Sequence, residues 1–173
     1  MDFVLSFYMQ PIGLSVLEII IFYLCYLGIL IFVKTTARLL ISVVVFVFSV
    51  ALILYCTIIN RGGCYEVVFL PFYSFVEARW QPEIFRTLIM NIVLFVPLGV
   101  SLPFVISNNV KHPIILALLI SISFSTIIEF CQLLFHLGRC EFDDVLANSI
   151  GSFLGETSYM LFLRIRCKFD GWK

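Results

Sequence analysis

Long apolar runs separated by short polar stretches are the dominant pattern along this chain. About five of them reach the length of roughly 20 residues that a helix needs to cross a bilayer. The first run follows MDFVLSFYMQ, which has no Lys or Arg, and no small-residue cleavage site comes after it, so we interpret it as a span and not as a signal peptide. The pattern predicts an all-α, polytopic bundle with transmembrane helices at residues 14–33, 39–59, 88–107, 113–135 and 145–163.

The longest connection, residues 60–87, is not uniformly polar. Its segment VVFLPFYSFV (67–76) is apolar and aromatic but too short to span, which predicts a re-entrant or interfacial segment. No linker, low-complexity tract or internal repeat divides the chain. We therefore expect residues 1–173 to form a single integral membrane domain.

Composition supports the membrane assignment and excludes one class of partner. The chain is 62% hydrophobic and 13% charged, whereas soluble domains have about 25% charged residues. A net charge of zero, without a basic tract, argues against a nucleic-acid partner and leaves the lipid bilayer as the expected one. No Cys or His spacing resembles a zinc site, and we predict no cofactor. Cys64 and Cys140, both expected outside, either pair or remain small buried hydrophobes.

The distribution of Lys and Arg predicts the orientation. If the N-terminus lies outside, the cytoplasm receives seven basic residues, which are Lys34, Arg38, Lys111, Arg164, Arg166, Lys168 and Lys173. The outside then receives four, which are Arg61, Arg79, Arg86 and Arg139. The positive-inside rule therefore favours an outer N-terminus and a cytoplasmic C-terminus.

Polar residues of several spans converge at one depth in this topology. Glu129 lies six residues before the end of the fourth span, about 9 Å below the outer surface. An ionisable side chain facing lipid costs about 2.5 to 3.5 kcal/mol, so Glu129 should face the bundle interior or a water-filled cavity. The predicted ligand-binding residues of this layer are Arg61, Asn91, Glu129, Gln132, Arg139, Asp144 and Asn148.

Some residues near this layer also have structural interpretations. Asp143 or Asp144 can cap the fifth helix, because an acid in the first turn satisfies free N–H groups. Asn148 can hydrogen-bond across a helix contact, and we expect Gly151 and Gly155 to allow close helix packing.

Two further features of the spans predict local structure. Pro97 and Pro103 each remove a backbone donor from the third span, which predicts a kink or a break there. Glu156 lies about halfway through the fifth span, so we expect a polar partner for it inside the bundle.

Two segments resemble the VanZ-like family of bacterial membrane proteins: NIVLFVPLGVSLPF (91–104) and IIEFCQLLFHLGRCEFDDVLANSIGSFLG (127–155). The resemblance covers about residues 55–156 and leaves the first span out. It departs from the family pattern at Glu141, where Asp is usual, and near Val68, where an Asn is absent. The matching positions are Asn91, Pro97, Leu98, Gly99, Glu129, Gln132, Gly138, Arg139, Asp144, Asn148, Gly151 and Gly155.

The resemblance implies a role at the bacterial cell envelope. The family is named for a member that lowers susceptibility to teicoplanin, so an effect on susceptibility to lipoglycopeptides is an expectation. No reaction is established for the family.

Two functions follow from the polar layer. In the first, its cavity binds an envelope amphiphile, such as a lipid-linked cell-wall precursor or a lipoglycopeptide tail, with Arg61 and Arg139 holding a phosphate or carboxylate. In the alternative, the chain is a membrane enzyme acting on a lipid-linked phosphate or ester. Its candidate catalytic residues are then Glu129, Arg139 and Asp144, and Glu141 and Asp144 are candidate ligands of Mg²⁺ or Ca²⁺. A transporter is disfavoured because the polar residues gather at one depth.

Overall fold

The computed structural model describes residues 12–59, 66–106 and 110–170. These residues are almost wholly helical, which confirms the all-α prediction. The helices are α2 (Ile12–Phe32), α3 (Thr35–Leu54), α4 (Tyr73–Glu77), α5 (Pro82–Val105), α6 (Pro113–Phe135) and α7 (Phe142–Asp170), with a π-helical turn, η1 (Tyr55–Ile59), continuing α3. The two short strands are β1 (Glu66–Val68) and β2 (Arg139–Glu141).

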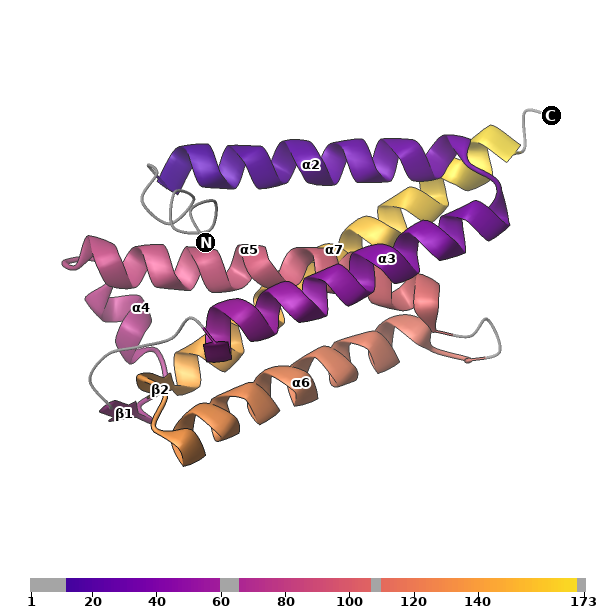
Figure 1. Ribbon diagram of the computed structural model, residues 1–173. Helices are drawn as coiled ribbons and strands as arrows, with labels where there is room; N and C mark the ends of the chain where they lie inside the picture. Colours follow the sequence, from indigo (N-terminus) through magenta and orange to yellow (C-terminus); the bar gives the residue numbers. More distant parts are fainter. Residues whose placement is uncertain (1–11, 60–65, 107–109, 171–173) are drawn as a thin grey trace.

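Helix α7 runs through the middle of the bundle, and its most extensive contact is with α5 (Figure 1). Helix α3 packs on α5, whereas α6 covers another side of α7. Both strands and α4 lie together where α6 ends and α7 begins, at the left of Figure 1. We call this region the polar end; it comprises η1, β1, α4, the first turns of α5, the last turns of α6, β2 and the first turns of α7.

The contact between α5 and α7 depends on glycines at the crossing. Ideal Cβ atoms added to Gly99, Gly151 or Gly155 would lie 2.0 to 2.3 Å from backbone carbonyl oxygens of the facing helix. Such distances leave no room for a side chain, so the predicted packing role of Gly151 and Gly155 is confirmed. Lipid is as apolar as the helix surfaces, so close van der Waals contact of this kind is a main source of helix association in membranes.

Three helices in the described part of the chain are long and apolar enough to cross a membrane: Thr36–Ile59, Pro82–Val105 and Pro113–Phe135. Helix α7 is less apolar because buried polar side chains line it, among them Asn148 and Glu156. Its central position explains how it tolerates them, since neighbouring helices cover that face. These apolar helices are those of a membrane protein.

Helix α5 continues through both of its internal prolines. It runs from Pro82 to Val105 with Pro97 and Pro103 inside it, so a break at these positions, one of the two predicted outcomes, is excluded. The hydroxyl of Ser101 donates to the carbonyl of Pro97 at 2.7 Å. Dense burial of this stretch against α7 holds the helix together although two backbone donors are missing.

At the end of the bundle opposite the polar end, Arg38 connects three helices. This residue is buried, and its guanidinium donates to the carbonyls of Leu30 at 3.2 Å and Val33 at 2.9 Å. It also lies 5.6 Å from the ring centroid of Phe162 on α7. Arg38 thus satisfies carbonyls at the end of α2 that have no helical partner and joins α2, α3 and α7.

Candidate functional site

A short parallel sheet joins the long connection after α3 to the turn between α6 and α7. Glu66 pairs with Arg139, Val67 with Cys140, and Val68 with Glu141. The strands were not predicted, because three residues are too few to show the period of two that indicates a strand.

The turn between α6 and β2 contains two residues with positive φ. His136 ends α6 in the left-handed conformation with a φ of 54°, and Gly138 follows with a φ of 80°. Glycine adopts positive φ without steric cost, so Gly138 suits this turn. Its carbonyl accepts from the N–H of Glu66 at 3.5 Å, which extends the contact between the two loops.

Arg139 is surrounded by carboxylates. Its Nε lies 2.8 Å from Glu141 Oε1 and 3.3 Å from Glu66 Oε2, and its Nη2 lies 3.6 Å from Glu77 Oε2. The guanidinium is also 5.9 Å from the ring centroid of Tyr73. A hydrogen bond to Glu77, with the charge of that residue, raises the pKa of Tyr73 above its ordinary value. The positive charge of Arg139 is therefore compensated by acids of this chain.

The ion pairs of Arg139 join three parts of the chain: β1 through Glu66, α4 through Glu77 and β2 through Glu141. Arg61, the other arginine of the predicted layer, lies outside the described residues.

Asp143 ties α4 to α7. It is 1% exposed, and its two carboxylate oxygens accept from the backbone N–H groups of Phe72 at 2.7 Å and Ser74 at 2.8 Å. Phe72 has a φ of 63°, a left-handed conformation that is costly for an aromatic residue and is held here by this contact. The neighbouring Glu141 accepts from the hydroxyl of Ser74. Asp143 thus caps α4, a helix distant in sequence.

Two buried polar residues of α6 lie next to these contacts. Glu129 is buried, and its Oε2 accepts from the N–H of Glu141 at 3.2 Å. Gln132 is fully buried, and its amide donates to the carbonyl of Thr57 at 2.9 Å. Thr57 belongs to η1, and π-helical turns of this kind occur often at functional sites. Both side chains face the bundle interior.

The remaining residues that were predicted to form the site or a disulfide lie on α5, on β2, on α7 or outside the described residues. Asp144 and Asn148 are buried on the first turns of α7, whereas Asn91 is half-buried on α5. Cys140 is a buried thiol that donates to the carbonyl of Glu129 at 3.5 Å. Its suggested partner, Cys64, lies outside the described residues.

A polar cleft of about 210 Å³ opens beside these groups. It is lined by Glu83, Ile84, Thr87, Leu88, Arg139, Glu141 and Asp144. Glu83, Ile84 and Thr87 were not among the predicted residues, because the predicted third span begins at residue 88 whereas α5 begins at Pro82. The Pro at the first helical position and the acid in the first turn are the signals that could have moved this boundary.

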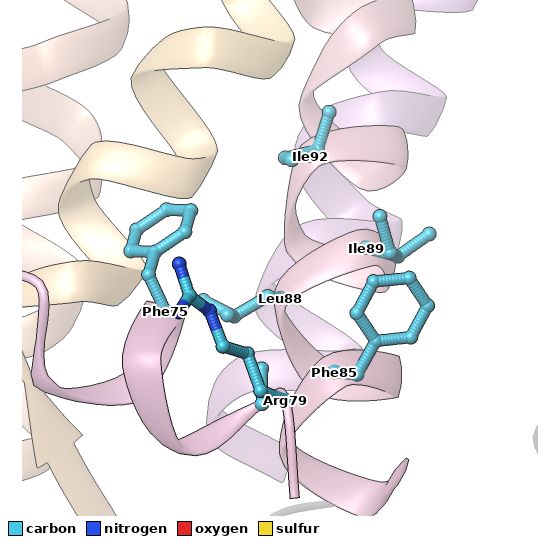
Figure 2. Close-up of a pocket in the computed structure, with 7 residues that line it drawn as sticks. Phe75, Arg79, Phe85, Leu88, Ile89 and Ile92 are labelled. Atoms are coloured by element: carbon cyan, nitrogen blue, oxygen red, sulfur yellow. The ribbon is translucent and has the colours of Figure 1, made fainter.

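An apolar groove of about 330 Å³ adjoins the cleft. It is lined by Phe75, Ala78, Arg79, Phe85, Leu88, Ile89 and Ile92. Figure 2 shows Phe75 and Arg79 on one wall and the α5 residues on the other, with the Arg79 guanidinium directed toward Phe75. Leu88, which is buried, lines both spaces, so the groove and the cleft are neighbours that share this side chain.

A metal centre finds no support in this arrangement. Among the residues that the structure describes, no group of three or more His, Cys, Asp or Glu side chains could hold a metal ion. The carboxylate of Glu141, a candidate metal ligand, pairs with Arg139 and accepts from Ser74.

Replacing Arg139 by Gln is expected to destabilise the fold by about 2 kcal/mol, because the buried carboxylate of Glu141 loses its counter-ion. The matched change Glu66→Gln should cost less than about 0.5 kcal/mol, since that partner is largely exposed. Thermal unfolding in detergent measures both. The double variant Arg139→Gln with Glu141→Gln should recover part of the loss, and no recovery would contradict the assignment of Glu141 as the main partner.

Comparison with known proteins supports one family. A family model described as VanZ/LLP1 matches residues 19–163. The match is wider than the predicted 55–156 and includes most of the first apolar run. No curated protein and no solved structure matches the chain.

Proposed function

The chain belongs to the VanZ/LLP1 family, and from that premise we propose that it is a multi-pass envelope protein whose polar end binds an amphiphile. The observation that carries the proposal is that a polar cleft and an apolar groove lie next to each other and share Leu88 as a lining residue. A molecule with a polar head and an acyl or prenyl chain has this division of chemistry.

The proposed membrane arrangement has five spans: α2, α3 with η1, α5, α6 and α7. An outer N-terminus and a cytoplasmic C-terminus satisfy the seven-to-four distribution of Lys and Arg. The polar end then lies at the outer leaflet, the side on which envelope precursors and lipoglycopeptides are met. Exposed apolar side chains in α4 and in the loops on either side of it suit a position at the membrane interface; they are Phe69, Leu70, Phe72, Val76 and Trp80.

The groove supplies most of the binding energy in this proposal. Each CH₂ group that leaves water for an apolar environment contributes about 0.8 kcal/mol. An amphiphile that approaches through the outer leaflet keeps its chain in contact with apolar surface throughout. The groove between α4 and α5 continues that surface up to the cleft.

For recognition of the head group, the proposal adds Arg79 to the arginines first expected. Arg139 is compensated by three carboxylates, so it contributes little net charge to an anionic ligand. Arg79 is exposed and lines the groove, which makes its guanidinium the better partner for a phosphate or carboxylate. Glu83, Thr87 and Asp144 offer acceptors to hydroxyl or amide groups. A lipid-linked cell-wall precursor or a lipoglycopeptide tail fits this set, and an effect on teicoplanin susceptibility would follow from binding.

Filling the groove is expected to abolish binding. Ala78→Trp places an indole among Phe75, Phe85 and Leu88, and we expect at least a tenfold loss of labelling by a photoreactive polyprenyl-linked cell-wall precursor in nanodiscs. In the wild type, the label should be found in residues 75–92. Ile127→Trp, on an exposed face of α6, adds the same side chain away from the groove and should leave labelling unchanged. Equal labelling of all three proteins would exclude the groove as the binding surface.

The same experiment tests the enzymatic alternative. Asp144 lines the cleft although it is 1% exposed, and Glu129 lies directly behind Glu141. Release of a cleaved head group by the wild type, but not by Glu129→Gln or Asp144→Asn, would support a membrane enzyme that acts on a lipid-linked phosphate or ester. Binding without release supports the amphiphile-binding function.

A further inference from the structure

Helix α7 carries a row of buried polar side chains on one face. Asp144, Asn148, Ser152 and Glu156 follow one another at intervals of four residues, and each is no more than 2% exposed. Residues at this spacing lie above one another on a helix. The row begins in the cleft at the polar end, and its last member is about 18 Å further along the helix.

A matching row on α6 faces it. The amide of Asn148 donates to the hydroxyl of Ser125 at 2.8 Å, which fixes the register of two helices that run in opposite directions. With equal rise along both helices, Glu129 then lies level with Asp144, Ser121 with Ser152, and Ala117 with Glu156. All four α6 residues, Ala117, Ser121, Ser125 and Glu129, are buried. We call the contact between the two rows the polar seam.

Several oxygens in the polar seam have no hydrogen-bond partner within the described part of the chain. They are Ser121 Oγ, Asn148 Oδ1, Ser152 Oγ and both carboxylate oxygens of Glu156. A buried polar atom without a hydrogen-bond partner costs about 1 to 3 kcal/mol of stability. The polar seam contains several such atoms.

Hydroxyls elsewhere on the same two helices behave differently. Thr126 on α6 and Thr157 on α7 are exposed, and each donates to the carbonyl four residues earlier, at 2.9 and 2.8 Å. This bond is available to any Ser or Thr in a helix. Ser121 and Ser152 do not make it, so their hydroxyls are free to bond groups within the seam.

Among the residues that the structure describes, no charged group of a neighbouring helix pairs with Glu156. The stretches of α5 and α6 at this depth, residues 96–105 and 113–128, contain no titratable side chain. Helix α2 brings Tyr23 and Tyr26 toward this part of the bundle, Tyr159 lies on α7 itself, and Arg38 of α3 is bonded to carbonyls of α2. The predicted polar partner of Glu156 is thus not a protein side chain among the described residues.

We propose that the polar seam takes water molecules and carries protons between the cleft and Glu156. Water both donates and accepts, so a single file of molecules can satisfy the hydroxyls, the Asn148 oxygen and the carboxylate together. A hydronium ion at the cleft transfers its proton along the file, and the Glu156 carboxylate becomes a neutral carboxyl as one water molecule is left behind. Acidic residues inside the membrane serve in proton relays of pumps and transporters, and here Asp144 and Glu156 stand at the two ends of the row. This role is separate from amphiphile binding and adds a proton-binding site to the bundle.

Infrared difference spectroscopy of the full chain in nanodiscs tests the proposal. The carbonyl absorption of protonated Glu156, identified by its loss in Glu156→Gln or its displacement in Glu156→Asp, should titrate with bath pH and shift promptly in D₂O. Ser121→Ala with Ser152→Ala keeps the space but removes two members of the file, and should slow the D₂O shift at least tenfold. Ser123→Ala with Thr157→Ala, which alters exposed positions of the same helices, should leave the rate unchanged.

Two results would overturn the inference. One is a Glu156 absorption that neither titrates nor shifts in D₂O. The other is a shift whose rate is the same in the wild type and in the Ser121→Ala with Ser152→Ala variant, which would mean that protons reach Glu156 by another route. Ser121→Ala with Ser152→Ala removes only hydroxyls without a hydrogen-bond partner among the described residues, and Ser123→Ala with Thr157→Ala alters exposed positions, so both variants should fold.

Discussion

Replacing Gly151 by Ala is expected to destabilise the protein by about 3 kcal/mol or more, at the upper end of overpacking effects. The added Cβ would lie 2.0 Å from the carbonyl oxygen of Ile92. That obstacle is backbone within α5, so no rotamer change can relieve it, and the two central helices must separate. Gly151→Leu should prevent accumulation of folded protein altogether. Membrane abundance and thermal unfolding in detergent measure both effects.

Gly28 provides the matched control. A Cβ added there meets nothing within 4 Å, so Gly28→Ala should be neutral or should stabilise α2 by up to about 1 kcal/mol, the difference in helix propensity. A similar loss of stability in both variants would mean that the α5–α7 crossing is not the tight contact described above.

Replacing Asp143 by Ala is expected to release α4 from α7. Two backbone N–H groups lose a charged acceptor, and hydrogen bonds to charged groups contribute about 1.5 to 3 kcal/mol each, so the loss should reach about 3 to 6 kcal/mol. The left-handed conformation of Phe72 also loses its support. Limited proteolysis should then cut within residues 66–81, and the unfolding temperature should fall.

Two further variants distinguish loss of the Asp143 hydrogen bonds from a general effect of removing negative charge. Asp143→Asn retains one acceptor oxygen and should show about half of the loss seen for Asp143→Ala. Glu83→Ala removes an exposed acid from the first turn of α5 and should cost less than about 1 kcal/mol. If Asp143→Asn behaved like the wild type, one hydrogen bond would suffice to hold α4.

The helices could be predicted from apolar run length, because backbone groups in lipid must bond within their own segment. Each of the five runs falls on a helix, and 113–135 coincides with α6. The burial of Glu129 also followed from the cost of placing an acid against lipid. The start of α5 at Pro82 was missed because Glu83 and Arg86 lower the apolar character of its first turn.

The contacts of the polar end could not be predicted, because they join loops through tertiary structure. Nothing in the local sequence of Glu66 or Glu77 indicates that Arg139 is their partner. Asp143 is a similar case. As an acid in the first turn of α7 it was expected to cap that helix, and its sequence position does not indicate that it caps α4. The unbroken course of α5 through Pro97 and Pro103 likewise depends on its packing against α7.

The pairing of β1 with β2 has a consequence for biosynthesis. The two strands are far apart in sequence, so β1 leaves the ribosome long before its partner and waits while α5 and α6 are inserted. Contacts with such large sequence separation form late. Until β2 arrives, the backbone N–H and C=O groups along the edge of β1 have no strand to pair with, and Glu66 and Glu77 lack the arginine that neutralises them. The polar end can therefore assemble only after β2 has been synthesised.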